Sequence, residues 1–265
     1  WCPDTTNNNV YKDLEITFVP DATFEAAKTG VSYNSNELVT SQYAITGGKL
    51  TLKPSAAGNT CLRVAGSGTV VVTATDYLET SVFQTIQAGA VTSLEVLTQP
   101  LPGAASGEAF APQPVVKLKD QYGNYCITGP DATANVTATA KDGTGSWVIG
   151  GTTDKTASAG TATFTNLTCT LISVGDGRMA FASGVDKAID SNSFTIPLKS
   201  AKNLTADTTN NNVDNELEIT FVPDATFEAA ITGVSYNGNT LAAGQYVVTS
   251  GKLTLKPSVD GNTYL

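Results

Sequence analysis

The sequence contains no histidine, and this absence excludes most of the familiar catalytic arrangements. None of its 265 residues is histidine, which is the commonest general base in enzymes and a common metal ligand. A Ser–His–Asp or Cys–His arrangement is therefore excluded. Carboxylate pairs remain, such as Glu15 with Asp21 and their counterparts Glu218 with Asp224. Alternation along the expected strand turns Glu15 toward solvent, so we predict that the chain is not an enzyme.

Charge is also scarce, and positive charge most of all. Charged residues make up 15% of the chain, with 15 Lys and Arg against 24 Asp and Glu, which gives a formal net charge of −9. Nucleic acids and anionic membrane surfaces are bound through clustered basic side chains. No apolar run approaches the ~20 residues that a membrane-spanning helix needs. We therefore predict no nucleic-acid partner and no membrane insertion.

What the sequence does have is a long internal repeat. The segment from Asp4 to Leu62 returns as Asp207 to Leu265 in constant register and without a gap, and about three quarters of the aligned positions are identical. Solenoid repeats are only ~20–50 residues long, so these copies are duplicated modules. Duplication serves reach, spacing or many weak contacts more often than it serves one catalytic site.

The repeat and the strand pattern predict three segments, which are residues 1–90, 91–198 and 199–265. In the first segment, alternating runs such as LEITF and KLTLK predict β-strands, and the alternation puts Leu50 and Leu52 on the core face. The stretch PDATFEAA predicts one or two helical turns, with Asp21 as the cap and Phe24 folded into the core. TVVVTAT and SVFQTI predict two further strands.

The second segment has strand-like runs at roughly 8–15-residue intervals with polar turns between them, a spacing that favours a β-sandwich. VVKLK at Val115 to Lys119 is the clearest of these runs, and DQYGN after it is a turn signal. Together the segments predict an all-β chain of tandem immunoglobulin-like β-sandwich modules in an elongated arrangement.

The third segment repeats the first only in part. It stops at Leu265, where its twin continues with TVVVTAT and SVFQTI. Without counterparts of these strands, the third module cannot close its sandwich alone. Two explanations stay open: the natural chain continues, or a neighbouring molecule donates strands to the open sheet edge.

The cysteines suggest two disulfides. The chain has four cysteines, Cys2, Cys61, Cys126 and Cys169. Cys2 aligns with Thr205 and Cys61 with Tyr264, so one copy of the module has both cysteines and the other has neither. We predict structural disulfides Cys2–Cys61 and Cys126–Cys169, which would place the chain outside the cytosol. The alternative is four reduced cysteines that act as small buried residues.

Two kinds of ligand site are considered. DTTNNN and the Asp-Gly loops of residues 141–146 and 174–178 offer the oxygen ligands that calcium prefers. They lack EF-hand spacing and are ordinary turn formers, so we predict no cofactor and no metal site, with calcium as the alternative. Tyr33 and Tyr236 lie in the VSYN turns of the two copies and are candidate ligand contacts. Trp147, by contrast, is interpreted as a core residue.

Several motifs carry a resemblance to known families. The runs LTADTTNNN, EITFVPD, ITGVSYNGNTL and QYVVTSGKLTL resemble a domain family linked to hemoglobin interaction. LEVLTQP, PVVKLKDQYGN and TATFTNLT in the middle segment resemble the bacterial immunoglobulin-like repeats of surface-layer and adhesin proteins. Such modules occur in large secreted proteins of Gram-positive bacteria. The resemblance implies immunoglobulin-like sandwiches, no catalysis and an extracellular location on the bacterial cell surface.

These observations predict a structural repeat region of a secreted surface protein, serving spacing, adhesion and surface-layer or filament assembly. The expected partners are other copies of the chain or neighbouring modules, including strand donation at the third segment. The alternative is a dedicated binding module for a host protein such as hemoglobin or for a polysaccharide. A third alternative is an accessory module of a secreted polysaccharide-degrading enzyme.

Overall fold

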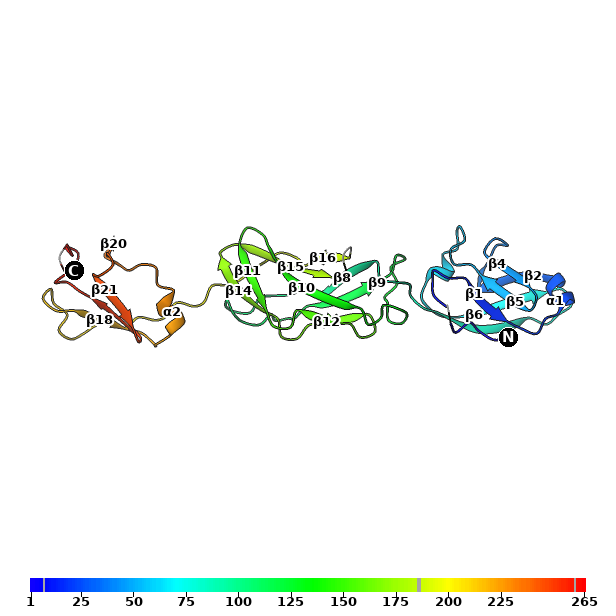
Figure 1. Cartoon of the computed structure of the whole chain (residues 1–265), viewed down its shortest axis with the longest axis horizontal. Coiled ribbons are helices and arrows are strands. Elements are labelled where there is room, and N and C mark those ends of the chain that lie inside the picture. Colours follow the sequence, from blue (N-terminus) through cyan, green and yellow to red (C-terminus); the bar gives the residue numbers. More distant parts are fainter. Residues whose placement is uncertain (7, 185–186, 260) are drawn as a thin grey trace. The chain divides into compact units, whose positions relative to one another are not determined.

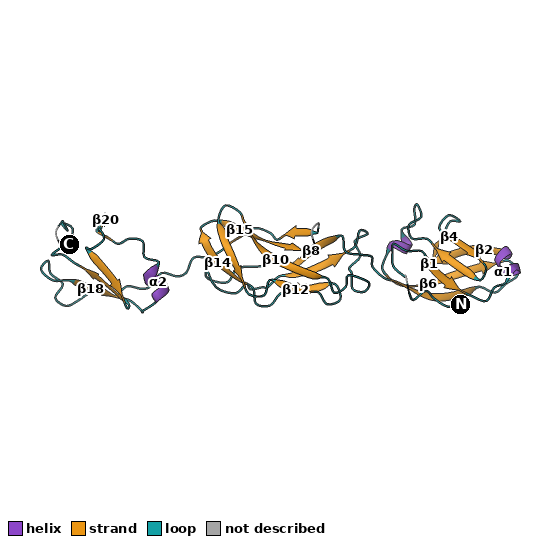
Figure 2. Cartoon of the chain, in the orientation of Figure 1, coloured by secondary structure: helices purple, strands orange, loops and turns teal. Residues whose placement is uncertain are grey.

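The computed structural model describes residues 1–6, 8–184, 187–259 and 261–265. In that part the chain is built mainly from β-strands, with two short α-helices and one 3-10 turn (Figures 1 and 2). No helix in the described part has the length and apolar character that a membrane span requires. The chain divides into two compact units, Trp1–Leu198 and Lys199–Leu265. The predicted boundary after residue 90 falls inside the first unit and stays a prediction.

Two antiparallel sheets form the first module. One sheet has the strand order β1-β5-β4 and the other β3-β2-β6-β7. Their strands are β1 (Leu14–Thr17), β2 (Lys28–Tyr33), β3 (Asn36–Glu37), β4 (Tyr43–Thr46), β5 (Lys49–Leu52), β6 (Gly66–Ala74) and β7 (Thr80–Ile86). Side chains from both sheets meet in one hydrophobic cluster, so the module is a β-sandwich.

The alternation in the sequence decides which side chains fill this core. β1 pairs with β5 so that Leu14 lies opposite Leu52 and Ile16 opposite Leu50. All four side chains are 0% exposed, and burying each one contributes roughly 1.5–3 kcal/mol. The prediction that Leu50 and Leu52 face the core is confirmed.

A short helix, α1 (Ala22–Ala27), links the two sheets. The side chain of Asp21 accepts hydrogen bonds from the backbone amides of Thr23 and Phe24, at 2.9 and 3.0 Å. A carboxylate in this position satisfies amide groups that have no partner within the helix. Phe24 is buried at 8% exposure, so the predicted cap and the predicted core contact are both confirmed.

A carboxylate on α1 also holds the turn between β4 and β5. Glu25 Oε1 accepts from the amide of Gly48 at 2.7 Å, and Oε2 accepts from the amide of Gly47 at 2.9 Å. Gly48 has φ +76°, and a Cβ there would lie 2.7 Å from the carbonyl oxygen of Phe18. Only glycine fits this turn without strain. The second copy repeats the arrangement, with Glu228 bonded to the amides of Ser250 and Gly251.

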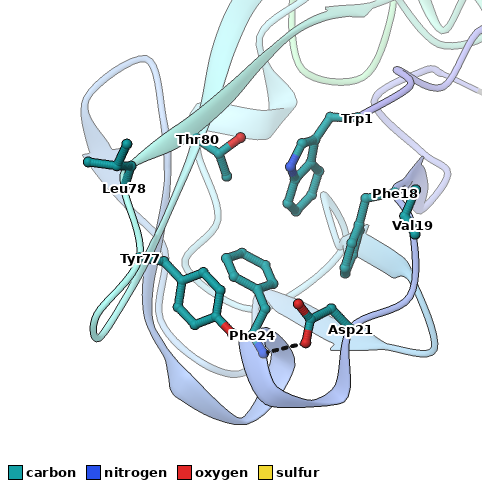
Figure 3. A pocket seen from close by; sticks show the side chains of 8 residues that line it. All are labelled: Trp1, Phe18, Val19, Asp21, Phe24, Tyr77, Leu78 and Thr80. Carbon is teal, nitrogen blue, oxygen red and sulfur yellow. Dashed lines mark hydrogen bonds between the residues drawn. The ribbon is translucent and has the colours of Figure 1, made fainter.

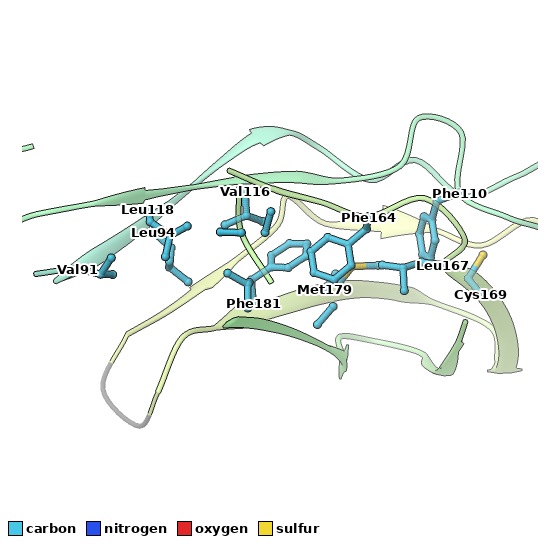
Figure 4. Close-up of a cluster of buried hydrophobic side chains, with 14 of the residues drawn as sticks. Val91, Leu94, Phe110, Val116, Leu118, Phe164, Leu167, Cys169, Met179 and Phe181 are labelled. Atoms are coloured by element: carbon cyan, nitrogen blue, oxygen red, sulfur yellow. The ribbon is translucent and has the colours of Figure 1, made fainter. Parts of the chain in front are cut away.

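The middle module is a second sandwich. Its strands are β8 (Ser93–Thr98), β9 (Val115–Lys119), β10 (Asn135–Asp142), β11 (Ser146–Gly150), β12 (Asp154–Thr156), β13 (Thr161–Thr163), β14 (Thr168–Ser173), β15 (Asp176–Ala182), β16 (Ala188–Asp190) and β17 (Phe194–Thr195). β12-β10-β15-β16 form the largest sheet, with β17 also on β15, beside the sheets β13-β9-β8 and β11-β14. The core holds Phe164, Phe181, Met179 and Leu118 (Figure 4). Trp147 is 3% exposed, so its interpretation as a core residue is confirmed.

The first and middle modules touch through the turn after β9. The side chain of Asn124 donates to the carbonyl of Arg63 at 2.8 Å and accepts from the amide of Ala65 at 2.9 Å. The guanidinium of Arg63 lies 5.1 Å from the ring centroid of Tyr122, a cation–π distance. Tyr11 packs on the same ring, with centroids 5.7 Å apart.

The second unit repeats the first sheet of the first module and only part of the second. β18 (Leu217–Thr220), β22 (Lys252–Leu255) and β21 (Tyr246–Thr249) form one sheet, and β19 (Ser235–Tyr236) pairs with β20 (Asn239–Thr240). The helix α2 (Ala225–Ala229) matches α1. The buried core consists of Phe221, Leu241, Leu253 and Leu255. The prediction of an all-β chain of tandem immunoglobulin-like sandwich modules is confirmed.

The predicted disulfide between Cys2 and Cys61 is not formed, and both thiols are free. Cys2 forms a bridge with Thr17, the last residue of β1, which lies opposite the first residue of β5. Cys61 lies beyond the other end of β5, with its thiol against the side chain of Asn59. The side-chain amide of Asn59 donates to the carbonyl of Lys53, the residue directly after β5. Three residue steps along a strand span about 10 Å, more than the ~7 Å that a disulfide bridges.

The predicted disulfide between Cys126 and Cys169 is also absent, and both thiols are buried. Cys126 Sγ lies 3.6 Å from the carbonyl oxygen of Gly89, whereas Cys169 Sγ lies 3.8 Å from that of Glu108. Val91, two residues after Gly89, and Cys169 stand at opposite ends of the core cluster (Figure 4). All four cysteines are therefore reduced, as in the alternative, but only Cys126 and Cys169 are buried, while Cys2 is exposed and Cys61 half-buried. The cysteines give no information about the compartment.

Candidate functional site

The candidate site is an aromatic pocket at one end of the first module. It encloses about 340 Å³ between the end of β1, the helix α1 and the turn that precedes β7 (Figure 3). Its lining consists of Trp1, Phe18, Val19, Asp21, Phe24, Tyr77, Leu78 and Thr80. Most of this surface is aromatic or aliphatic, which is typical of a recognition surface.

Four aromatic rings form the walls of the pocket. Trp1 stacks on Phe18 with ring centroids 4.3 Å apart. Phe24 packs edge-on against Phe18 at 5.9 Å and against Tyr77 at 5.2 Å. Such pairs contribute about 0.5–1.5 kcal/mol beyond the area that they bury. The walls are therefore fixed before any partner arrives.

Two aliphatic side chains form an exposed rim around these rings. Val19 is 85% exposed and Leu78 is 95% exposed, while Tyr77 in the wall is 39% exposed. Leaving a large aliphatic side chain in water forgoes roughly 1.5–3 kcal/mol of burial. Exposed apolar groups clustered around a pocket mark interaction sites in soluble proteins.

The one carboxylate in the lining is already engaged. Asp21 accepts from the amides of Thr23 and Phe24 as the helix cap, and Figure 3 shows its bond to the Phe24 amide. The pocket therefore offers mainly apolar contact, with the Trp1 indole N–H, the Asp21 carboxylate and the hydroxyl groups of Tyr77 and Thr80 as its polar lining groups.

Part of this site recurs in the second unit. Val222 is the counterpart of Val19 and is 73% exposed, and Phe221 and Phe227 replace Phe18 and Phe24. Phe221 and Phe227 lie edge to face with centroids 5.4 Å apart. Trp1 is replaced by Leu204. The described residues of the second unit include no counterpart of Tyr77 or Leu78, so only the first module presents the whole pocket.

The two tyrosines predicted as ligand contacts lie in different environments. Tyr33 is only 3% exposed and belongs to the core, and burial raises the pKa of its hydroxyl. It cannot contact a ligand, because its side chain lies in the core cluster with its ring against Gly68 of β6. Tyr236 is 37% exposed and lines a separate groove of the second unit. The hypothesis of a matched pair of exposed tyrosines is therefore wrong for Tyr33.

Two tyrosines of the middle module, Tyr122 and Tyr125, serve structural contacts. Tyr122 lies at the junction of the first and middle modules, as described above. Tyr125 donates its hydroxyl to Glu95 Oε2 at 3.0 Å. A hydrogen bond from Lys119, followed by that from Tyr125, lowers the pKa of Glu95.

The two DTTNNN segments fold around hydrogen-bonded Asp side chains, and the Asp-Gly loops of residues 141–146 and 174–178 connect β10 to β11 and β14 to β15. In DTTNNN, Asp4 accepts from the amides of Thr6 and Glu15, at 2.9 and 3.0 Å, while residue 7 lies outside the described residues. Asp207 repeats these bonds, and the amide of Glu218 is the main cause of its lowered pKa. Within the described part of the chain, no group of three or more acidic or cysteine side chains is arranged to hold a metal. Calcium stays an untested alternative.

Sequence reasoning missed the aromatic pocket, although a signal for it was present. The expected strand LEITF is followed by Val19, which breaks the in-and-out alternation, and the turn TDYLET places Tyr77 and Leu78 together where polar residues are usual. Tyr77 packs on the ring of Phe24, while Leu78 stays 95% exposed. The pair is therefore a sequence signal for an apolar surface at this turn.

The comparison with family models finds one match. The model described as "Heme-binding protein Shr-like, Hb-interacting domain" matches residues 2–87 and 204–262. These ranges correspond to the two copies of the repeated module, and the first includes Phe18, Phe24, Tyr77 and Leu78. No curated protein matches the chain.

Solved structures with similar folds include immunoglobulin-domain proteins, an adhesin and glycoside-cleaving enzymes, all at low identity. Sidekick-1 immunoglobulin domains 1–5 are 12% identical with a TM-score of 0.22, and the match covers 93% of this chain and 51% of that one. A complex of Dpr2 Ig1-Ig2 with DIP-Theta Ig1-Ig3 is 10% identical with a TM-score of 0.33, and the match covers 95% of this chain and 85% of that one. The Yersinia pseudotuberculosis adhesin InvE is 15% identical with a TM-score of 0.31, and the match covers 89% of this chain and 70% of that one. The chain thus spans about half the length of the Sidekick-1 structure.

Proposed function

Because this chain belongs to the family of Shr-like hemoglobin-interacting domains over residues 2–87 and 204–262, we propose that it is a protein-recognition segment of a bacterial surface protein. Its proposed partner is hemoglobin, and its proposed location is the extracellular face of the cell. The aromatic pocket of the first module carries the proposal.

The chemistry of the pocket suits a protein partner. Aromatic side chains are enriched at protein interfaces and supply most of the residues whose truncation is costly. Here the Trp1 and Phe24 rings are held by mutual packing, while Val19 and Leu78 stand in solvent around them. An apolar side chain from a partner that enters the pocket would bury the rim and the ring faces together.

The experiment measures hemoglobin binding to the full chain by surface plasmon resonance. Wild-type chain is expected to bind saturably. Leu78→Ser and Val19→Ser are each expected to weaken binding about tenfold, equivalent to about 1.4 kcal/mol. Val174→Ser is the matched control, because Val174 lies in the middle module and is 71% exposed, so its loss should leave the affinity unchanged.

Three results would contradict this proposal. One is the absence of saturable binding to hemoglobin. Another is an equal loss of affinity in the Val174→Ser control and the two pocket variants. The third is saturable binding to a polysaccharide that the pocket variants abolish, which would assign the same pocket to the polysaccharide alternative.

A second candidate function is mechanical: spacing and adhesion, with assembly into a surface layer or filament. The observation that favours it is that the first and middle modules each have a complete core of their own. Modules of this kind fold independently and can be strung together. Under either function we propose a non-catalytic role. Analytical ultracentrifugation of the chain would support assembly if polymers form as the concentration rises.

A further inference from the structure

The segment before β1 is bonded directly to the end of the last strand of the first module. The bridge between Asn9 and Gln87 is parallel, whereas the sheet pairings of this module are antiparallel. The amide of Val10 donates to the carbonyl of Gln87 at 3.1 Å, and the amide of Gln87 donates to the carbonyl of Asn8 at 2.6 Å. Gln87 directly follows β7, so the beginning and the end of the module are joined backbone to backbone.

Two buried side chains extend this pairing. Gln84 is 0% exposed, and its Oε1 accepts from the amide of Asp4 at 2.8 Å while its Nε2 donates to the carbonyl of Asp4 at 2.9 Å. The side chain of Asn8 donates to the carbonyl of Thr85 at 3.1 Å. Burying an amide side chain costs free energy unless it is hydrogen-bonded, and both side chains spend bonds on the opposite segment. We call the pairing of Asp4, Asn8 and Val10 with the end of β7 the parallel contact.

Tension across the module loads the parallel contact in shear. A pull on the chain before residue 4 draws Asp4 and Asn8 toward the start of the chain, and a pull from the middle module draws β7 in the opposite sense. Because the two segments run in the same direction, these pulls slide them past each other and stretch all the bonds between them at once. In an antiparallel pair the same pulls would meet at one end and open the bonds one after another.

The middle module grips the chain directly after β7. The amide of Gly89 donates to Asp120 Oδ2 at 3.0 Å, and the amide of Val91 donates to Asp131 Oδ2 at 2.8 Å. Gly89 and Asp120 are both buried. A pull that arrives through the middle module is therefore passed to Gln87 over a short, bonded connection.

We propose that the first module bears tension, and that the parallel contact is the element that resists it. This inference deepens the mechanical candidate function given above and rests on it. Bonds elsewhere in the module, such as those of Glu25 to the turn between β4 and β5, do not join the two pulled segments. The lifetime of the module under force therefore depends on the parallel contact and on the direction of the pull.

The first experiment holds the full chain by its two ends at constant force and measures the lifetime of the first module. Unfolding of this module is identified by a length gain of roughly 250 Å between Val10 and Gln87. Gln84→Leu removes both bonds to Asp4 and keeps a side chain of similar size, and it should shorten the lifetime about tenfold. Asn8→Ala should shorten it by a similar factor.

Glu25→Ala is the matched control for these variants. It removes the two bonds to the β4–β5 turn and is expected to lower the equilibrium stability of the same module. Because that turn is still formed when the pulled segments part, the lifetime under force should stay within about twofold of wild type. Thermal unfolding of each variant checks that it is folded, and Asn8→Ala carries the test if Gln84→Leu is not.

The second experiment changes the direction of the pull and keeps every bond of the parallel contact. In a Cys61→Ala background, one handle is attached to the exposed Cys2 and the other to the thiol introduced by Glu79→Cys, an exposed position directly before β7. Both handles then pull on the starts of the two parallel segments, so the bonds open one after another. The lifetime should be at least about tenfold shorter than with handles at Cys2 and Leu265.

Two results would overturn the proposal. One is a lifetime of the Gln84→Leu and Asn8→Ala variants that equals that of Glu25→Ala, and the other is an equal lifetime in the two pulling directions. Neither lifetime depends on hemoglobin binding or on the formation of polymers in the ultracentrifuge, so this proposal and the proposed functions fail separately.

Discussion

Tyr33 and Tyr236 occupy the same position of the repeated module, yet Tyr33 is 3% exposed and Tyr236 is 37% exposed. Both lie in the sequence GVSYN, and both begin a tight hairpin turn. The difference comes from β6, which covers Tyr33 and has no counterpart among the described residues of the second unit. Identical local sequence therefore gives a core residue in one copy and a groove wall in the other.

This difference predicts unequal costs for the same substitution. Tyr33→Ala should destabilise the first module by about 3 kcal/mol, as for other buried aromatics, whereas Tyr236→Ala should cost the second unit about 1 kcal/mol or less. Hydrogen exchange in increasing denaturant, read on peptides from each module, measures both values. Equal costs would show that Tyr236 is as buried in solution as Tyr33.

The Glu25 carboxylate is expected to stabilise the turn that it holds. Glu25→Ala removes the acceptor of the Gly47 and Gly48 amides and should cost the first module about 1.5–3 kcal/mol, the range for hydrogen bonds to charged groups. Glu79→Ala, at an exposed position, is the control and should stay within about 0.5 kcal/mol of wild type. Urea unfolding measured by hydrogen exchange of residues 43–52 gives the comparison. A loss of unfolding free energy no larger than that of the control would contradict the prediction, because it would mean that water bonds the Gly47 and Gly48 amides as well as the carboxylate does.

The local structure of the repeated module could be predicted from sequence because it depends on neighbours in the chain. Alternation placed Leu50 and Leu52 in the core, and the Asp21 cap followed from the residue type before a helical pattern. The strand β14 (Thr168–Ser173) gave no comparable signal, because its side chains are mostly half-buried or exposed and do not alternate regularly.

The pairing of distant residues could not be predicted in the same way. The repeat linked Cys2 to Cys61 because both were lost in the second copy, but loss together does not place two residues side by side. Their separation follows from the register between β1 and β5, which no local pattern contains. The same holds for the pocket, since Trp1, Phe24 and Tyr77 come together only after the sheets pack.

Asn124 is expected to couple the first and middle modules. Its side chain joins Arg63 and Ala65 across the junction. Asn124→Ala removes both bonds, together with the bond from its amide to the Asp120 carboxylate, at a cost of about 1–3 kcal/mol. In differential scanning calorimetry, the unfolding transitions of the two modules should lie further apart in temperature in Asn124→Ala than in the wild type. Asn192→Ala serves as the control at a distant loop of the middle module and should leave the junction intact. Unchanged calorimetric transitions in Asn124→Ala would mean that the ring contacts of Tyr122 hold the modules together without the amide.

The buried thiol of Cys126 predicts a loss of stability at alkaline pH. Burial raises the pKa of Cys126 to about 11, while a thiol in an unfolded chain ionises near 8.5. As the pH rises through this window, the unfolded state releases its proton before the folded state does, so the free energy of unfolding of the middle module falls. Below about pH 8 both states keep the proton, and the stability contribution of Cys126 is constant there.

Cys126→Ala is the variant that isolates this effect, because it keeps a small apolar side chain and removes the titrating group. Urea unfolding of the middle module is followed by Trp147 fluorescence in a Trp1→Phe background. The free energy of unfolding should fall less steeply between pH 9 and 11 in the variant than in the parent chain. Iodoacetamide at pH 8 should modify Cys2, which is exposed, well before Cys126, which is buried. Equal pH slopes in variant and parent, or equal rates of modification of the two thiols, would show that solvent reaches Cys126 in the folded module.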